Sequence, residues 1–363
     1  MRIGITLDMS VAFWANGLQQ NIVFLYSLLR SAGNKCIYIT HKKPAYYLNK
    51  KHEGLLLKDL MDDPLEKLDV LIVAGFDLLP QMYDELKNRN RNLKIVLLHL
   101  GNKLMDDIHY SICVDSPHKT PLEKPRHLDE IWISPHHEFA KNYLKCYYNT
   151  DKIKVAPYIW DPFFMQEKIK ELSNKKLSPF FESKKVSDIC IFEPNISSIK
   201  NCMIPMSICE RLEQKFPNVI KSVNTFCCEK LRDKKYFFKY MERMKIVKRK
   251  ICFFNNRWAS LDALSKFGST VVSHQINNEL NYSYLEALYL GLPLIHNSKM
   301  LENQGYYYPD FDVDMGSNQL YSAILNHEKV KEEYMRESRR FTSQYSPYLE
   351  SNKQIYMNLL NES

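Results

Sequence analysis

Short runs of β-branched and other apolar residues alternate along this chain with longer segments in which apolar residues recur at helical spacing. Such alternation is typical of βαβ units, in which the strands lie parallel and helices cover the sheet. The alternation occurs in two successive series, so it predicts an α/β protein with two Rossmann-like domains. Strands are expected at residues 3–7, 35–40, 70–74, 95–99 and 130–134, and then at 188–193, 219–225, 250–254, 270–273 and 292–296.

The length agrees with this division, because 363 residues suit two domains better than one or three. Residues 1–156 are expected to form the first domain and 186–316 the second, with a connection at 157–185 and a helical tail at 317–363 that packs back towards the first domain. Two such domains that face each other create a deep cleft, and ligands bind at the loops that follow the strands. Helices are expected at 17–30, 137–148, 203–215, 234–244 and 280–290.

Glycine and cysteine usage excludes several classes of protein. The 10 glycines include no G-x-G-x-x-G or G-x-x-x-x-G-K spacing, which argues against the usual dinucleotide site and the P-loop of kinases and ATPases. The nine cysteines form no C-x-x-C pair, so we expect reduced thiols in a cytoplasmic protein without structural zinc. Neither a signal peptide nor an apolar stretch that could span a bilayer is visible, so any membrane contact is expected to be peripheral, at the inner face.

A loop rich in amides joins the first expected strand to the first helix. Asn16 and Gly17 are suited to cap that helix, and the N–H groups of a helix N-terminus favour an anion or sugar hydroxyls. A capped helix with an apolar anchor would explain Trp14 and Gly17 but not the number of amides. The candidate ligand-binding residues of this segment are Trp14, Asn16, Gly17, Gln20 and Asn21.

Three more polar residues come just after strands of the first domain: Asp8, His99 and Asn102. A histidine at the carboxyl end of a strand can act as a general base or hydrogen-bond a substrate, although a lone histidine is more often structural. Asp8 and His99 are therefore the candidate proton acceptors, and Asn102 is a candidate ligand-binding residue.

The first strand of the second domain leads into a loop that contains Asn195, Ser197 and Lys200 and then into a helix. Amide, hydroxyl and ammonium groups at such a turn can hold phosphates without glycine, and Lys200 can neutralise a pyrophosphate beside the helix N-terminus. The alternative is a capping sequence in which Lys200 is solvated. Because several features agree, the sequence favours a phosphate site.

A second polar loop, which includes His274, precedes the helix expected at 280–290. Glu286 is expected in the second turn of that helix, with Glu279 seven residues earlier on about the same face. A carboxylate in that position can accept hydrogen bonds from both hydroxyls of a ribose. The alternative, an exposed helix charge, fits poorly between Leu285 and Leu288.

These stretches resemble a known family. LEAL at 285–288 and GLPLI at 291–295 resemble the C-terminal nucleotide-binding signature of GT-B glycosyltransferases. The whole chain resembles a bacterial and phage domain family related to the family-4-type glycosyltransferases. The matching stretches are 14–17, 20–21, 133–136, 159–162, 192–197, 200, 273–275, 280–282, 296–298 and 305–312.

The resemblance implies a GT-B fold and a nucleotide-sugar donor. Lys200 would contact the donor diphosphate and Glu286 its ribose, while His274, Asn281 and Tyr282 would line the diphosphate and sugar. The chain departs from the broader pattern: Asn278 replaces the first of two glutamates, and residues 280–282 replace a Gly-Phe-Gly turn. The D-x-D spacing at 310–312 is interpreted as a loop, so neither an essential metal nor a cofactor is expected.

The leading hypothesis is a cytoplasmic glycosyltransferase that acts on a hydroxyl of a surface glycan or a lipid-linked precursor. Two alternatives stay open: a phage-type transferase that glycosylates a modified DNA base, and a non-catalytic sugar- or nucleotide-binding module. An inverting enzyme would need Asp8 or His99 as base, whereas a retaining enzyme would not, and the sequence does not decide between them.

The positive charge is concentrated in one segment. Residues 230–250 contain ten Lys and Arg against two Asp and Glu, which equals the whole chain's net charge of +8. Interleaved aromatic residues favour a helix with a buried aromatic face and a solvated basic one. The functional alternative is a polyanion contact, with phospholipid headgroups or nucleic acid.

Overall fold

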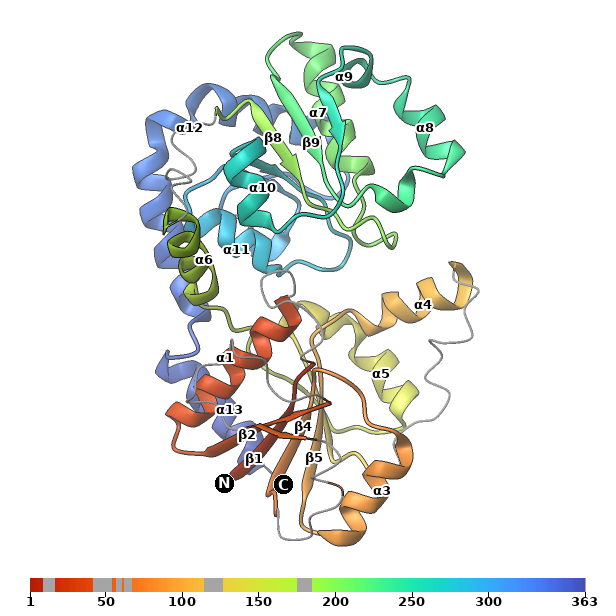
Figure 1. Cartoon of the computed structure of the whole chain (residues 1–363), viewed down its shortest axis with the longest axis vertical. Coiled ribbons are helices and arrows are strands. Elements are labelled where there is room, and N and C mark those ends of the chain that lie inside the picture. Colours follow the sequence, from red (N-terminus) through yellow and green to blue (C-terminus); the bar gives the residue numbers. More distant parts are fainter. Residues whose placement is uncertain are drawn as a thin grey trace. The chain divides into compact units, whose positions relative to one another are not determined.

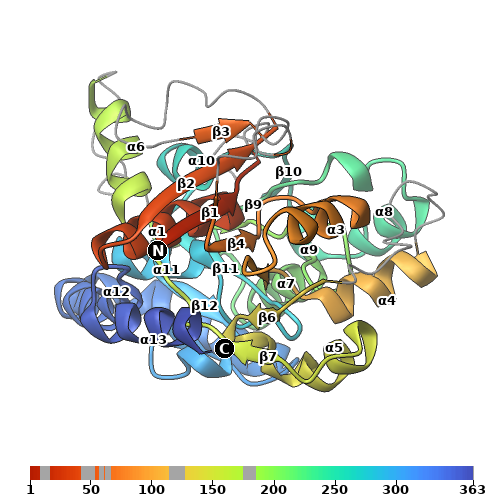
Figure 2. The same cartoon turned by 90° about the horizontal axis from the view of Figure 1, so that it is seen from below.

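The computed structural model describes residues 1–8, 17–41, 54–56, 61, 67–113, 127–174 and 185–362. The chain divides into two units (Figures 1 and 2): the first comprises Met1–Asp161 and Tyr345–Ser363, and the second comprises Pro162–Gln344. Each unit is built on one parallel sheet, so the predicted α/β fold class is confirmed.

The described strands of the first unit form a seven-stranded sheet in the order β3-β2-β1-β4-β5-β6-β7. All neighbouring strands pair in parallel, and the strand order changes direction between β1 and β4. The strands are β1 (Arg2–Thr6), β2 (Lys35–Thr40), β3 (Gly54–Leu56), β4 (Val70–Val73), β5 (Lys94–His99), β6 (Glu130–Ile133) and β7 (Ile153–Val155).

Helices cover both faces of this sheet. In Figure 1, α1 and α13 lie side by side on one face, and α3 and α5 lie on the other. Tyr83 and Leu86 of α3 and Leu144 of α5 pack into the core formed with the strands. The helical segments are α1 (Gly17–Ser31), α3 (Pro80–Arg89), α4 (Lys103–Cys113), η2 (Pro135–Ala140), α5 (Lys141–Tyr148) and α13 (Glu350–Asn361).

The second unit has a six-stranded sheet in the order β10-β9-β8-β11-β12-β13, again with parallel neighbours. The order changes direction between β8 and β11, so the loops that follow these two strands lie at the position where open α/β sheets bind ligands. The strands are β8 (Asp188–Ile191), β9 (Ser222–Thr225), β10 (Cys252–Phe254), β11 (Thr270–Val272), β12 (Leu294–His296) and β13 (Tyr306–Tyr307).

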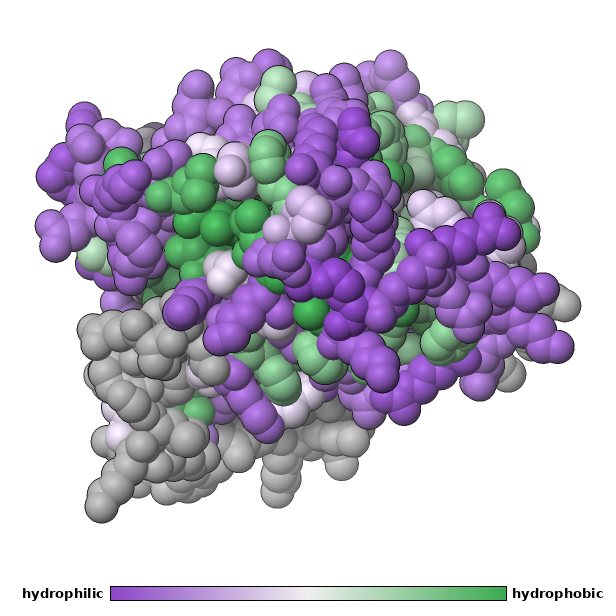
Figure 3. All heavy atoms as spheres, turned by 90° about the horizontal axis from the view of Figure 1, so that it is seen from above, coloured by the Kyte–Doolittle hydropathy of each residue, from purple (hydrophilic) through white to green (hydrophobic). Residues whose placement is uncertain are grey.

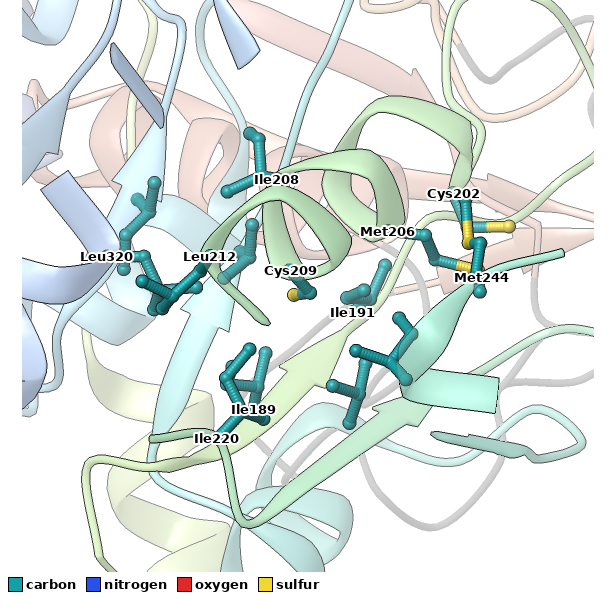
Figure 4. Packing of buried hydrophobic residues seen from close by; sticks show 14 of the residues in the cluster. Ile189, Ile191, Cys202, Met206, Ile208, Cys209, Leu212, Ile220, Met244 and Leu320 are labelled. Carbon is teal, nitrogen blue, oxygen red and sulfur yellow. The ribbon is translucent and has the colours of Figure 1, made fainter. Parts of the chain in front are cut away.

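The core of the second unit lies between its sheet and helices α7 and α12. Figure 4 shows Met206 and Leu212 of α7 packing with Ile191 of β8 and Leu320 of α12. Gly316 permits the close approach of the two helices, because a Cβ there would lie 2.7 Å from Cδ1 of Ile208. The helical segments are α6 (Phe163–Asn174), α7 (Met203–Lys215), η3 (Glu229–Leu231), α8 (Lys235–Met241), α9 (Lys245–Lys248), α10 (Ser260–Phe267), α11 (Tyr282–Tyr289), η4 (Lys299–Leu301), α12 (Val313–Thr342) and η5 (Ser343–Tyr345).

The ten expected strands all occur, with ends shifted by up to three residues, and β3, β7 and β13 are additional. The helix expected at 137–148 is a 3₁₀ segment followed by α5, and the helical tail begins earlier than expected, at Val313, and is interrupted between α12 and α13. The segment expected as a connection, 157–185, contains helix α6. None of the helices in the described ranges is long and apolar enough to cross a membrane.

Candidate functional site

Two loops at the carboxyl edge of the second sheet are joined to each other. Residues 192–202 connect β8 to α7, and residues 273–281 connect β11 to α11. Lys200 and Gln275 form an antiparallel bridge, and the N–H of Ile276 donates to the carbonyl of Ile199 at 3.0 Å. The structure therefore brings the two sequence-predicted donor segments together.

Asn195 fixes the shape of the first loop. Its backbone has a positive φ of 55°, and its side-chain Nδ2 donates to the carbonyls of Phe226, at 3.1 Å, and Cys227, at 3.3 Å. Its Oδ1 accepts from the N–H of Cys202 at 2.8 Å, directly before α7. Both polar atoms of the amide are therefore engaged within the protein, so Asn195 positions the loop, whereas the sequence suggested direct ligand binding.

A buried hydrogen-bond network joins the first residues of the two loops to Tyr284 and Tyr308. The Ser273 hydroxyl donates to Oε1 of Glu193 and lies 2.8 Å from the Tyr284 hydroxyl. The backbone N–H of His274 donates to the same Oε1 at 3.3 Å. Nδ1 of His274 lies 3.0 Å from the Tyr308 hydroxyl, which donates to the carbonyl of Ser273 at 3.0 Å. Of these residues the sequence analysis singled out His274 alone.

Burial shifts the pKa values of Glu193 and His274 in this network. It raises the pKa of Glu193 from 4.5 to about 7, against the opposing effects of the Ser273 hydrogen bond and the Lys200 charge. It also lowers the pKa of His274 from 6.5 to about 4, so the imidazole is neutral at physiological pH. Lys200 is half-buried, and its charge acts on the carboxyl group of Glu193.

Glu286 lies on α11 and is half-buried. The Ser260 hydroxyl at the start of α10 donates to its Oε2 at 3.0 Å, and burial raises the pKa of Glu286 from 4.5 to about 7. The expectation that Glu279 lies on the same helical face as Glu286 is wrong. Glu279 precedes the helix, which begins at Tyr282, and its carboxylate accepts from the N–H of Met300 at 2.8 Å.

The remaining donor-side candidates border the same loops. Asn281 is the N-cap of α11, and its Oδ1 accepts from the N–H of Ser283 at 3.0 Å. Tyr282 is buried and Ser197 is half-buried. Asn281 therefore sets the start of the helix that carries Glu286, a role that its sequence pattern of Asn followed by Ser would have indicated.

In the first unit, His99 and Asn102 follow β5. Nε2 of His99 lies 3.0 Å from the Tyr148 hydroxyl, and burial, reinforced by the Lys103 charge, lowers the pKa of His99 to about 4. Oδ1 of Asn102 accepts from the N–H of Met105 at 3.2 Å, in the first turn of α4. His99 is therefore neutral at physiological pH, and Asn102 stabilises a helix start.

Asp8 follows β1, which β4 separates from β5, so the strands that carry Asp8 and His99 are about 10 Å apart. The N–H of Asp8 donates to Oε1 of the buried Gln19 at 3.2 Å. Gly17 is the first residue of α1, where Gln20 and Asn21 are buried. Trp14 and Asn16 lie outside the described residues.

The basic segment forms an exposed surface on α8, α9 and the adjoining loops. All ten basic side chains are exposed. Phe237 is buried as expected, but Tyr236 is 81% exposed, so the aromatic residues do not all face the core. We define the basic surface by Lys230, Arg232, Lys234, Lys235, Lys239, Arg243, Lys245, Lys248, Arg249 and Lys250.

Within the described ranges, no group of three or more His, Cys, Asp or Glu side chains could hold a metal ion. Of the D-x-D stretch, Asp312 is the N-cap of α12, and its Oδ1 accepts from the N–H of Met315 at 2.8 Å. All nine cysteines are free thiols.

Several solved structures share this fold. TarM superposes with a TM-score of 0.64 at 8% identity over 99% of both chains. An alpha-glucosyltransferase in complex with UDP and DNA that contains an HMU base gives 0.60 at 11% identity, over 100% of this chain and 99% of that one. Anabaena HepE in complex with UDP-glucose gives 0.57 at 10% identity over 99% of both chains.

A mutant of S. aureus TarM gives a TM-score of 0.50 at 12% identity; the match covers 81% of this chain but only 55% of that one. No curated protein sequence matches the chain. A family model described as "Protein of unknown function (DUF2827)" matches residues 3–360. The chain therefore belongs to the DUF2827 family and has the two-sheet fold of GT-B glycosyltransferases.

Proposed function

We propose that this protein is a glycosyltransferase that moves a sugar from a nucleotide-sugar to a hydroxyl of a surface glycan or lipid-linked precursor. The observation that carries the proposal is the pair of joined loops after β8 and β11, which places Lys200 and the helix of Glu286 at the switch point of the second sheet. The fold is shared with proteins whose structures contain UDP or UDP-glucose.

The second unit would bind the donor. Lys200 would stabilise the diphosphate leaving group without a metal, and Glu286 would accept hydrogen bonds from the ribose. The first N–H groups of α7 contribute less than the sequence suggested, because those of Cys202 and Met203 donate to the side chains of Asn195 and Asn201. Ser197, His274, Asn281 and Tyr282 would surround the diphosphate and sugar. We propose for Glu286 the ribose-binding role of the glutamate in the family-4-type enzymes that the sequence resembles.

The first unit would bind the acceptor, through Trp14, Asn16, Gly17, Gln20, Asn21 and Asn102. His99 is neutral and able to accept a proton, although its lowered pKa makes it a weak base. Asp8 is the second candidate base. We propose a cytoplasmic location, in which the acceptor hydroxyl belongs to a glycan precursor at the inner membrane face.

The basic surface favours a second candidate acceptor, a modified base in DNA. Ten exposed cations with exposed Tyr236 among them suit a polyanion. The alpha-glucosyltransferase of the same fold was solved with DNA. The face of the molecule in Figure 3 is mostly hydrophilic, with hydrophobic atoms exposed in separate areas.

The first experiment is hydrolysis of UDP-, GDP- and TDP-sugars by the purified protein, followed by mass spectrometry of an acceptor panel incubated with the preferred donor. The panel contains glycan precursors and DNA with hydroxymethylated bases. Glycosylation of the DNA alone would favour the second candidate. Binding of a nucleotide-sugar without hydrolysis or transfer would instead indicate a non-catalytic module.

A further inference from the structure

The basic surface presents positive charge that the described part of the chain does not neutralise. On α7 and α12, Arg211 and Lys215 both form ion pairs with Asp314. Among the ten cations of the basic surface, by contrast, Arg249 is the only one that forms an ion pair with another described residue. Nine exposed cations are therefore available to a partner of opposite charge.

Some of these cations also lie one helical turn apart. Lys235 and Lys239 are four residues apart on α8, and Lys245 and Lys248 lie at the two ends of α9. Like charges three or four residues apart on a helix destabilise it. A bound polyanion would relieve this repulsion, so the arrangement favours a ligand with closely spaced negative charges.

Two tyrosine rings are exposed among these charges. Tyr236 and Tyr240 of α8 are 81% and 38% exposed, and one helical turn places their Cβ atoms about 5–6 Å apart. A different face of the helix, with Phe237 and Met241, packs into the core of the second unit. That face holds α8 in place, so the two tyrosine rings are available to a partner.

Exposed rings among cations discriminate between polyanions. The bases of a duplex are paired and stacked on one another, so they offer no face to a tyrosine ring. The bases of a single strand can stack on aromatic side chains while its phosphates contact Lys and Arg. A membrane would take up the apolar face of a helix, but Phe237 and Met241 of α8 already lie in the core. A single strand therefore fits this surface best.

We propose that the basic surface binds single-stranded nucleic acid, with bases stacked on Tyr236 and Tyr240 and phosphates beside the surrounding cations. These residues belong to the connection between β9 and β10 (Figure 1), and none of them lies in the loops that follow β8 and β11. The proposal concerns a partner of the protein and does not depend on sugar transfer. DNA and RNA single strands share the chemistry that this surface recognises, and the experiment separates them.

The test measures fluorescence anisotropy with labelled oligo(dT), oligo(U) and a duplex of the same length. The unchanged protein should bind at least one single strand more tightly than the duplex. Tyr236→Ala should weaken single-strand binding about tenfold and duplex binding less than about twofold, because it removes a stacking surface. Tyr236→Phe keeps the ring and should retain the affinity. The matched control is Tyr348→Ala, which removes a tyrosine of the first unit that is 55% exposed and should leave binding unchanged.

Salt dependence separates the rings from the charges. Lys239→Gln removes one phosphate contact, so the slope of the logarithm of the binding constant against that of the salt concentration should become shallower by about 0.7. Tyr236→Ala should lower the affinity at every salt concentration and leave this slope unchanged. An altered slope in Tyr236→Ala would show that the ring acts through the phosphates, which would contradict stacking.

Three other outcomes would overturn the proposal: equal losses for single strand and duplex in Tyr236→Ala, tighter binding to phosphatidylglycerol vesicles than to either single strand, and no binding to any probe at low salt. The second would assign the surface to a membrane. Tighter binding of oligo(U) or of oligo(dT) would identify the partner as RNA or DNA. An unchanged melting curve shows that each variant is folded. Donor hydrolysis plays no part in these measurements, so their failure is distinguishable from failure of the proposed function.

Discussion

The loops at the carboxyl edges of the two sheets differ in how their polar residues are held. In the second unit, a β-bridge and a shared network bind the loops after β8 and β11 to each other, through residues such as Glu193 and Ser273. In the first unit, His99 contacts Tyr148 at the end of α5 and Asn102 caps α4, so these two residues are held by different elements. The fold thus preorganises the proposed donor site, as a site that binds a leaving group requires.

The largest expected effect tests this difference directly. Lys200→Ala should lower kcat/KM for donor hydrolysis by about 10²- to 10³-fold, because it removes a positive charge from the proposed diphosphate site. Release of the nucleoside diphosphate is the measurement, and Lys221→Ala, an exposed lysine of the same unit, is the control with less than about a twofold effect. An unaltered rate in Lys200→Ala would mean that the donor binds elsewhere.

Glu193 at the second edge and His99 at the first should contribute to the pH dependence of stability with opposite signs. The pKa of Glu193 is raised to about 7, so the folded protein binds a proton more tightly than the unfolded chain, and this residue's contribution falls by up to about 3 kcal/mol as the pH rises from 4.5 to 7. The pKa of His99 is lowered to about 4, so its contribution rises with pH between 4 and 6.5.

Urea unfolding at several pH values checks these signs. Relative to the unchanged protein, Glu193→Gln should gain stability as the pH rises from 4.5 to 7, whereas His99→Gln should lose stability from pH 4 to 6.5. Parallel trends for the two variants would contradict the assignment of one buried acid and one buried neutral base.

Removal of single hydroxyls should also separate the two units. Tyr308→Phe breaks two buried hydrogen bonds, with His274 and Ser273, and should cost about 1–3 kcal/mol. Tyr148→Phe breaks the bond to His99 and should cost about 0.5–1.5 kcal/mol. The denaturant midpoints of both variants measure these two costs. Equal costs would show that the two hydroxyls are held equally firmly and would contradict the difference between the units.

The smallest effect concerns the basic surface. Arg249 forms an ion pair with Glu213, which is 1% exposed, so replacing this arginine would leave a buried carboxylate. The triple change Lys239→Gln, Lys245→Gln and Lys248→Gln avoids that pair. It should change stability by less than about 0.5 kcal/mol per site and leave donor binding intact, but weaken salt-dependent binding to duplex DNA.

Filter binding at several salt concentrations measures the affinity of each variant for duplex DNA. The same comparison with anionic vesicles tests the second polyanion. A loss of vesicle binding alone would assign the surface to a membrane. Undiminished binding to both would show that the basic surface is only a solvated face of the second unit.

The sequence predicted the ten strands because alternating patterns reflect burial that is local along the chain. It missed Glu193, which it placed within a strand, and Tyr308, whose partner His274 lies 34 residues away. It also placed Glu279 on the face of Glu286, although the Asn281 cap begins the helix after Glu279. Hydrogen bonds between distant segments leave no periodic signal, so these contacts could not be deduced.

By itself, the sequence determined the fold class, the order of strands and helices and the loops in which polar residues gather, because each depends on neighbours within one or two turns of chain. The tertiary structure alone decided what those residues do. In the folded chain the Asn195 side chain holds its loop, and Arg249 forms an ion pair with Glu213. Oε2 of Glu193 and Nε2 of His274 are buried without hydrogen-bond partners in the described part of the chain. Such assignments depend on which strands become neighbours and on what the resulting burial does to each pKa.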